Sequence, residues 1–218
     1  IINKLEKTIS QIVIAESMIL MGHVTSLFIN KYSLAAAYRI QKINCKPYEI
    51  LNRYNDSEIK YIILKQYMGR SYITTKPGVH ESLGLKMYVQ STSPLRRYLD
   101  LIIQRQVYNK INNYELLTIN SVSKIIDYSK NRQTENNNIV KNDKFKYLTL
   151  FFKNEKKPFY KIIFVKWINH KKNIALVYFP DYSLEILITL FVSIEIYSNK
   201  IYKVKYIIND SNLLEFIY

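Results

Sequence analysis

The sequence predicts an α+β fold, in which a mostly helical region is followed by a small β-barrel. Two patterns support this class. Apolar residues from Ile9 onward recur at helix spacing, whereas after Phe159 they form short runs separated by polar turns. The change of period predicts two domains, residues 1–153 and residues 159–218, with a boundary near Asn154–Pro158.

The N-terminal segment is expected to form a helix with one packed apolar face. This face consists of Ile9, Ile12, Val13, Ile19, Leu20, Val24, Leu27 and Phe28. Further helix is predicted at Lys46–Arg53 and at Asp56–Met68. Residues 74–85 contain one proline and two glycines and are predicted to form a loop that leads into the next helix.

The segment Tyr88–Arg105 reads YVQSTSPLRRYLDLIIQR and carries the strongest chemical signal. Thr92 or Ser93 can cap a helix and the proline that follows suits a first turn, so a helix is predicted to begin here. This start would contain Arg96 and Arg97. Because a helix N-terminus already carries partial positive charge, two cations there favour a bound anion, and phosphate fits best. An ordinary solvated helix start is the alternative.

The polar segments after this helix predict where it ends and where a linker follows. Asn112 and Asn113 are expected to end the helix, and Ser121–Tyr128 is predicted to begin another. Lys130–Lys146 is rich in Asn, Lys and Gln, and its propensities predict a linker.

The C-terminal region contains the β-type runs KIIFVKWI, NIALVYF, LEILITLF and KIYKVKYII. About five short strands suit a small barrel, of either the OB or the SH3-like type. Basic and aromatic residues alternate on the first of these runs and in the turn after it, as they do on RNA-binding surfaces; they are Lys161, Lys166, Trp167, Lys171 and Lys172.

Composition favours a polyanionic partner. The formal net charge is +15, and 20 tyrosines and 9 phenylalanines offer stacking surfaces, so nucleic acid is favoured over an anionic membrane. The bias toward Ile, Lys, Asn and Tyr also fits an A+T-rich genome, which weakens the charge argument. The single cysteine, Cys45, excludes an intrachain disulfide and a cysteine-based zinc site. No apolar run approaches membrane-spanning length, so no membrane partner is expected.

The arginine segment resembles the signature Y-x-x-x-T-S-P-I-R-R-Y-x-D-L-x-x-x-R of the ribonuclease II, or RNB, family. The matching residues are Tyr88, Thr92, Ser93, Pro94, Arg96, Arg97, Tyr98, Asp100, Leu101 and Arg105, with Leu95 at the isoleucine. Three other segments resemble family elements in the family's order: ESMILMGHV from Glu16, YRIQ at Tyr38–Gln41 and HESLGL at His80–Leu85. The QRQ at Gln104–Gln106 is similar to the cyanobacterial and plastid branch.

The resemblance implies the C-terminal part of an RNB catalytic domain followed by an S1-type OB barrel. It implies a 3′-to-5′ exoribonuclease that hydrolyses single-stranded RNA to nucleoside 5′-monophosphates with the help of two Mg²⁺ ions. It also implies that the predicted linker continues as helix, interrupted near Asn136–Asn138.

Several residues acquire expected roles from the same resemblance. Arg96 matches the catalytic arginine that holds the attacked phosphate. Arg97 is a second RNA-binding candidate that could instead pair with Asp100. Glu16 matches the glutamate that contacts the terminal ribose, where a carboxylate favours RNA through its 2′-OH. The remaining candidates are Thr92 and Ser93, which can cap the helix and touch phosphate, and His80, which contacts RNA or orders its loop.

One family element is missing from the sequence. Nothing resembles the D-P-x-x-x-x-D-x-D-D cluster that binds the metal ions, and the aspartates are scattered: Asp56, Asp100, Asp127, Asp143, Asp181 and Asp210. Mg²⁺ is therefore expected in the intact enzyme but has no ligands in this chain, and the chain alone is expected to be inactive.

The chain has no initiator methionine and begins within helical periodicity, so we expect a fragment of a longer enzyme. Its metal-binding N-terminal half would then lie upstream or on another polypeptide, and its partners would be that half and single-stranded RNA. The alternative is a non-catalytic RNA-binding or structural subunit derived from such an enzyme. The composition and the branch resemblance together suggest a plastid or another organelle.

Overall fold

The computed structural model describes residues 8–43, 65, 68–155, 157–191, 201–208 and 214–217. Their contacts separate two compact units, one formed mainly by residues 8–43 and 68–137 and the other by the residues from 138 onward. The division falls within one helix, α5 (Ile119–Glu155). The predicted domain bounds, 1–153 and 159–218, stay a prediction. The predicted α+β class is confirmed.

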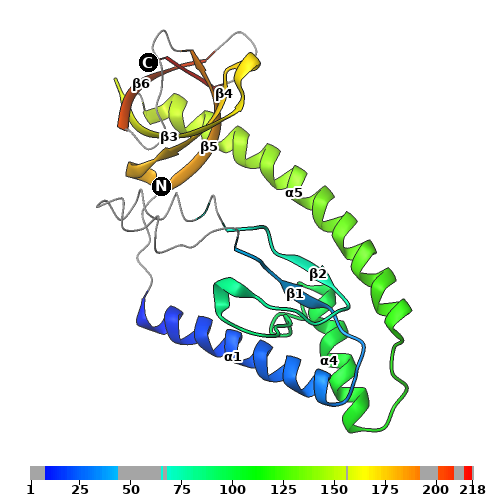
Figure 1. The fold of residues 1–218 in the computed structure, drawn as a ribbon. Helices are drawn as coiled ribbons and strands as arrows, with labels where there is room; N and C mark the ends of the chain where they lie inside the picture. The colour runs from blue at the N-terminus through cyan, green and yellow to red at the C-terminus, as the bar shows by residue number, and fades with distance from the viewer. Residues whose placement is uncertain are drawn as a thin grey trace. The chain divides into compact units, whose positions relative to one another are not determined.

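Within the described residues, the helical unit contains two helices, a small sheet and the start of α5 (Figure 1). Its elements are α1 (Ile9–Lys31), β1 (Tyr38–Ile40), β2 (Tyr72–Thr74), the 3₁₀ turn η1 (Glu81–Leu83) and α4 (Tyr98–Ile111). Strands β1 and β2 are antiparallel, with Arg39 opposite Ile73. A core of buried apolar residues joins these elements and includes Ile29, Ala36, Tyr38, Val89, Ile102, Ile103, Val122 and Ile126. The predicted loop before the motif is confirmed, apart from η1.

Helix α1 is present as predicted, but its packed face is not the predicted one. Thr8 and Gln11 form a capping box at its start. Its buried residues are Gly22, Thr25, Ser26 and Ile29. Most of the predicted apolar face is exposed, with exposed fractions of 45–81% for Ile9, Ile12, Val13, Leu20, Val24 and Leu27. The prediction was wrong because periodicity reveals an apolar face without revealing whether neighbouring segments cover it.

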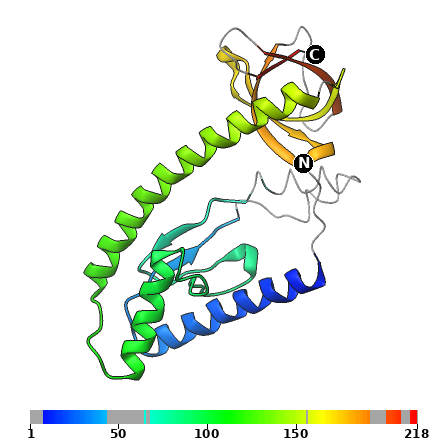
Figure 2. The ribbon, with the colours of Figure 1, turned by 180° about the vertical axis from the view of Figure 1, so that it is seen from behind.

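The small residues of α1 allow close packing against residues 87–89, at the start of the motif. A Cβ atom at Gly22 would lie 2.4 Å from both Tyr88 Cε2 and the carbonyl oxygen of Val89. His23 Nδ1 lies 3.1 Å from the Met87 carbonyl oxygen on the same segment. Figures 1 and 2 show α1 and α4 as neighbours in this unit.

By length and composition, α1 is long and apolar enough to cross a membrane, with a mean hydropathy of 1.8. This corrects the expectation that no apolar run approaches that length. A single such helix near the N-terminus is a weak indication, because core helices and signal sequences pass the same test.

Helix α4 begins later than predicted. Its first residue is Tyr98, its N-cap is Arg97, and neither Thr92 nor Ser93 caps it through a side chain. The Ser93 carbonyl instead accepts hydrogen bonds from the backbone N–H groups of Arg96 and Arg97, at 3.3 and 3.0 Å, and so forms a turn. The predicted helix end is confirmed, because Asn112 is the C-cap and Asn113 follows with a φ of 55°.

Helix α5 is continuous, so the helix that the resemblance implied across Lys130–Lys146 is confirmed. The linker predicted there from propensity and the interruption at Asn136–Asn138 were both wrong. Propensity differences among Asn, Lys and Gln amount to only a few tenths of a kcal/mol per residue, which a long helix can absorb. Arg132 reinforces the exposed stretch through an ion pair with Glu135 at 3.0 Å and a cation–π contact with Tyr128. The helices predicted at Lys46–Arg53 and Asp56–Met68 lie almost wholly outside the described residues; Met68 itself is described and forms a β-bridge with Ile43.

The second unit is a closed five-stranded barrel (Figures 1 and 2). Its strands are β3 (Tyr160–Asn169), β4 (Ile174–Phe179), β5 (Leu184–Phe191), β6 (Ile201–Ile208) and β7 (Leu214–Ile217). They are ordered β3-β4-β5-β7-β6, and only the β5–β7 pair is parallel. This is the strand order of an OB fold, so the OB alternative is confirmed and the SH3-like one is excluded.

The end of α5 packs on the barrel and is tied to it by a polar group. Phe152 is fully buried in the barrel core. Tyr182, in the 3₁₀ turn η3 (Pro180–Tyr182), donates a hydrogen bond to the Glu155 carboxylate at 2.6 Å, and Lys157 contacts both partners. Burial and the bond to Glu155 raise the pKa of Tyr182 to about 12.

Candidate nucleic-acid interface

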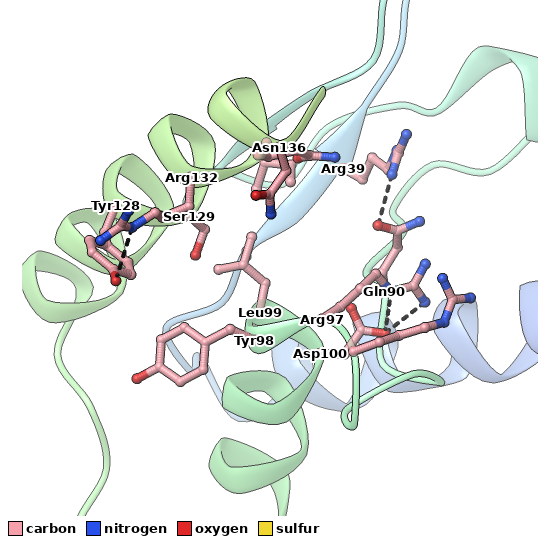
Figure 3. A pocket seen from close by; sticks show the side chains of 14 residues that line it. Arg39, Gln90, Arg97, Tyr98, Leu99, Asp100, Tyr128, Ser129, Arg132 and Asn136 are labelled. Atoms are coloured by element: carbon pink, nitrogen blue, oxygen red, sulfur yellow. Dashed lines mark hydrogen bonds and ion pairs between the residues drawn. The ribbon is translucent and has the colours of Figure 1, made fainter. Parts of the chain in front are cut away.

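A cavity of about 540 Å³ lies in the helical unit, beside the arginine motif. Its walls come from β1, β2, the motif and the first part of α5, which are far apart in the sequence. The lining residues include four arginines, Arg39, Arg96, Arg97 and Arg132. Figure 3 shows Arg39, Gln90, Arg97 and Asp100 on one side, and Tyr128, Ser129, Arg132 and Asn136 of α5 on the other. A cavity of this size falls within the range of small-ligand sites.

Arg97 is fixed at the cavity wall by Asp100. Its Nη2 and Nε atoms donate to Asp100 Oδ2 at 2.7 and 3.0 Å, and the Ser93 N–H donates to the same oxygen at 2.9 Å. Asp100 is only 1% exposed, while the side chain of Arg97 is 29% exposed. The pairing of Arg97 with Asp100 foreseen from the sequence is therefore present, and it largely compensates the charge of Arg97.

Arg39 approaches the cavity from β1. Its Nε donates to Ser71 Oγ at 3.0 Å, and its Nη1 donates to Gln90 Oε1 at 2.8 Å. Both acceptors are neutral. Burial lowers the pKa of Arg39, and the nearby charge of Arg97 lowers it further, although Tyr88 and Asp100 partly oppose this. Arg39 nonetheless stays protonated at neutral pH.

The other two arginines of the cavity, Arg96 and Arg132, differ in whether they form an ion pair. Arg96 is exposed and forms no ion pair with any residue that the structure describes. Arg132 lines the cavity from α5 and is paired with Glu135. Arg39 and Arg96 are therefore the two cations of the cavity whose charge is left without a carboxylate partner within the described part of the chain.

The α5 wall adds neutral polar groups. Ser129 lines the cavity, and its buried hydroxyl oxygen has no hydrogen-bond partner among the described residues. Gln133 and Asn136 line the cavity from the same helix. An anion held by the arginines would therefore face hydroxyl and amide groups as well, which suits a phosphate ester of a polar molecule.

The structure does not bring all the predicted site residues together. Thr92 and Ser93 are partly buried beside the motif but do not line the cavity, and Ser93 acts through its backbone. Glu16 lies on the exposed side of α1, among the uncovered apolar residues, and is likewise not a lining residue. Arg96 and Arg97 are the predicted residues that the cavity unites.

His80 is an internal residue of its loop. It is 6% exposed, its Nδ1 lies 3.2 Å from Ser82 Oγ, and its ring packs edge-on against Tyr88 at 5.5 Å. Burial lowers the pKa of His80, and the charge of Arg39 lowers it further. These contacts support the loop-ordering interpretation of His80 over direct RNA contact.

Sequence reasoning noticed Arg39 only as part of YRIQ and did not place it at the site. Its position next to Arg97 depends on the pairing of β1 with β2 and on the Tyr88 carbonyl, which accepts the Arg39 backbone N–H at 2.9 Å. The resemblance of YRIQ to a family element was the one signal that could have pointed to it.

The barrel offers a weaker basic surface. Lys161, Lys166, Lys171 and Lys172 are exposed as expected, while Trp167 is partly buried between Phe164 and His170. Trp167 is therefore partly used in packing, and the exposed lysines do not line the cavity beside the arginine motif.

Within the described residues, no three His, Cys, Asp or Glu side chains gather in a group that could hold a metal ion. Asp100, the acidic residue at the cavity, already accepts three hydrogen bonds from protein groups through Oδ2. The described residues therefore do not fit a Mg²⁺ site, and no chemical step is assigned to a metal here.

Comparison with known proteins agrees with this geometry. Residues 1–113, more than half of the chain, match the family model of the RNB domain. The chain belongs to the RNB family of ribonucleases. Its arginine motif and cavity walls β1, β2 and α4 fall within the matched region. One sequence relative is a protein of Synechocystis called an uncharacterized ribonuclease, which is 26% identical over 83% of this chain. This relative is consistent with the resemblance of the motif to the cyanobacterial branch.

Solved structures of RNB exoribonucleases share the fold. A Dss1 exoribonuclease active-site mutant from Candida glabrata aligns with 98% of this chain at a TM-score of 0.82 and 15% identity. Mycoplasma genitalium RNase R, in complex with ribose-methylated single-stranded RNA, aligns with 98% at a TM-score of 0.71 and 15% identity. The chain spans 28% of the Synechocystis relative and 29% and 42% of these two structures.

Proposed function

We propose that this chain is part of a 3′-to-5′ exoribonuclease that hydrolyses single-stranded RNA to nucleoside 5′-monophosphates. The observation that carries the proposal is the cavity in which Arg39, Arg96 and Arg97 of an RNB domain converge. Arginine is the side chain best suited to phosphate, because its fork of N–H groups forms charge-assisted bonds with two oxygens at once. The RNA complex of the structurally similar RNase R supports RNA as the source of that phosphate.

In this proposal the chain contributes binding and charge stabilisation. Arg96, exposed and without a carboxylate partner among the described residues, is the arginine that holds the attacked phosphate as negative charge develops on it. Arg97, oriented by Asp100, presents the remaining face of its guanidinium to a neighbouring phosphate. Mg²⁺, if it takes part, would be held by residues outside the described part of this chain.

Glu16 is proposed as the contact to the terminal ribose. Its carboxylate is exposed on α1 and could accept a hydrogen bond from a 2′-OH, which DNA lacks. Because Glu16 does not line the arginine cavity, this role requires the RNA to extend beyond the cavity.

The remainder of an RNB enzyme is the proposed partner of α1. Apolar side chains exposed along one helix are costly in water, and a second part of the same domain would cover them. The chain spans 28% of the Synechocystis relative and 42% of the RNase R chain, so these proteins contain further sequence beyond the matched part. We propose a plastid or another organelle as the location of the enzyme, from composition and the branch resemblance, with the cytoplasm as the alternative; subcellular fractionation tests this.

A non-catalytic RNA-binding subunit is the second candidate. It is favoured by the lack of a metal-binding acidic group among the described residues. Both candidates require RNA binding at the cavity, and they differ in whether a catalytic half completes the site.

The test measures binding and cleavage of a 5′-labelled single-stranded RNA by the purified chain. We expect binding in which Arg96→Ala weakens affinity about tenfold, the effect of one charge-assisted hydrogen bond, whereas Lys171→Ala has little effect. Equal effects of the two substitutions would show general basicity and would contradict a built phosphate site. With Mg²⁺ present, we expect the RNA to remain intact; stepwise shortening of the labelled strand from its 3′ end would show that the chain holds a complete catalytic centre.

A further inference from the structure

Arg39 differs from the other arginines of the cavity in being partly buried without a carboxylate partner among the described residues. Arg97 is paired with Asp100 and Arg132 with Glu135, while Arg96 reaches solvent. Arg39 has only the neutral acceptors Ser71 and Gln90 among the described residues. A cation withdrawn from water is stable only if an anion or strong acceptors replace the lost hydration.

The hydrogen bonds of Arg39 leave part of its guanidinium available. Its five N–H groups include one used by Ser71 and one used by Gln90. The other three have no partner among the described residues. Ser71 and Gln90 therefore hold the guanidinium plane in place, while its free edge can meet a ligand.

The neighbouring charges identify what that ligand must be. Burial lowers the pKa of Arg39, and the charge of Arg97 lowers it further, while the Asp100 carboxylate offsets this only in part. The two guanidinium groups at the cavity wall therefore still repel each other. An anion between them removes the repulsion and supplies acceptors to both. A neutral ligand or a cation would leave the repulsion in place.

We propose that Arg39 is a further phosphodiester-binding residue of the cavity beside Arg96, held in position by Ser71 and Gln90 and acting with Arg97. The assignment rests on the proposed function, because it takes RNA as the source of the phosphate. It goes beyond that function in adding a residue of β1 to the arginines of the motif, so the phosphate site spans two segments of the chain.

The alternative is that Arg39 is a structural residue whose hydrogen bonds hold Ser71 and Gln90 together. The two roles predict different responses to an anion. A binding residue couples stability to phosphate concentration, since a ligand that binds only the folded state raises its stability. A structural residue affects stability equally with and without phosphate.

The experiment compares the full chain with Arg39→Gln, Arg39→Lys and the control Arg70→Gln. Arg70 is an exposed arginine beside Ser71 that does not line the cavity. Thermal unfolding is followed with and without inorganic phosphate, and binding of a single-stranded oligoribonucleotide is measured over a series of salt concentrations.

We expect phosphate to raise the unfolding midpoint of the wild type and of Arg70→Gln but not of Arg39→Gln. Arg39→Gln should weaken RNA binding about tenfold, as expected for a charged hydrogen-bonding group. It should also reduce the slope of log K against log salt by roughly 0.7, the contribution of one phosphate contact on a single strand. Arg39→Lys should keep most of the slope but lose affinity, because lysine cannot use the two anchoring acceptors in the same way.

Two results would overturn the inference. One is an Arg39→Gln variant that retains the phosphate-dependent rise in midpoint. The other is an Arg39→Gln variant that binds RNA as tightly as the wild type while Arg96→Ala binds weakly; this would leave the proposed function intact and exclude Arg39 alone. Failure of the wild type to bind RNA would instead refute the proposed function itself.

Discussion

The carboxylate of Asp100 and the guanidinium of Arg97 form the central ion pair of the motif, with Nη2 and Oδ2 2.7 Å apart. The same oxygen accepts the backbone N–H of Ser93, so one buried carboxylate fixes both the arginine and the turn before α4. This relationship compensates the charge of Arg97 at the N-cap of α4, where a cation is otherwise unfavourable.

Asp100→Asn is expected to destabilise the chain by about 2 kcal/mol, because Arg97 loses its charged partner and the Ser93 N–H keeps a weaker acceptor. Urea unfolding of the variant and of the wild type measures the difference. Asp127→Asn, on the exposed side of α5, is the control and should change stability by less than about 0.5 kcal/mol. Equal effects of the two substitutions would contradict a structural role for Asp100.

Gly22→Ala tests the close packing of α1. The new Cβ would meet Tyr88 and the carbonyl oxygen of Val89 at 2.4 Å, and the backbone oxygen cannot move without shifting the motif approach. The clash should outweigh the better helix propensity of alanine, with a net loss of about 1–2 kcal/mol. The exposed control Asn30→Ala should show no loss in the same unfolding experiment. A more stable Gly22→Ala variant would show that α1 can move away from this segment.

His80 should make stability depend on pH. Burial lowers its pKa in the folded chain below the ordinary value of about 6.5, so the unfolded chain binds more protons in this range. The contribution of neutral His80 to the free energy of unfolding is therefore complete above about pH 6.5, and it is lost as the pH falls through the folded-state pKa. Measured unfolding free energies between about pH 7.5 and pH 5 should show this fall.

The contribution of His80 can be separated from that of other groups by substitution. His80→Gln should reduce the fall in stability, whereas His170→Gln, at an exposed position in the barrel, should retain it. A fall of the same size in both variants would assign the pH dependence to other groups.

The sequence was informative where local pattern decides structure. The short apolar runs after Phe159 predicted the barrel strands, because alternate residues of a strand face its core. It was less informative where distant residues compete with local preference. A hydroxyl cap was predicted for α4, yet the Asp100 carboxylate binds the Ser93 N–H and moves the helix start to Tyr98.

The sequence did not predict Arg39 as a site residue for the same physical reason. Arg39 lies far from the motif in the sequence, and only the β1–β2 pairing and the Tyr88 contact bring it to the cavity. Likewise the Asn-rich stretch of α5 is weak helix by propensity but continues as helix between segments that pack at both ends, near Val122 and Phe152.

The exposed side of α1 yields the last prediction, which concerns association. Leu20 and Val24 are 61% and 52% exposed and lie on the same side of the helix. A contiguous apolar surface of this kind favours contact with any available apolar partner. In the absence of the rest of an RNB domain, the purified chain should therefore self-associate as its concentration rises.

Leu20→Lys combined with Val24→Lys should suppress this association without unfolding the chain, since neither side chain belongs to the buried core. Sedimentation velocity over a concentration series measures the effect, with Val140→Lys as a matched control at an exposed apolar position of α5. Association that persists in the double variant would show that the self-association surface lies elsewhere on the chain. Binding of the wild type, but not the double variant, to phospholipid vesicles would instead favour a membrane surface as the partner of α1.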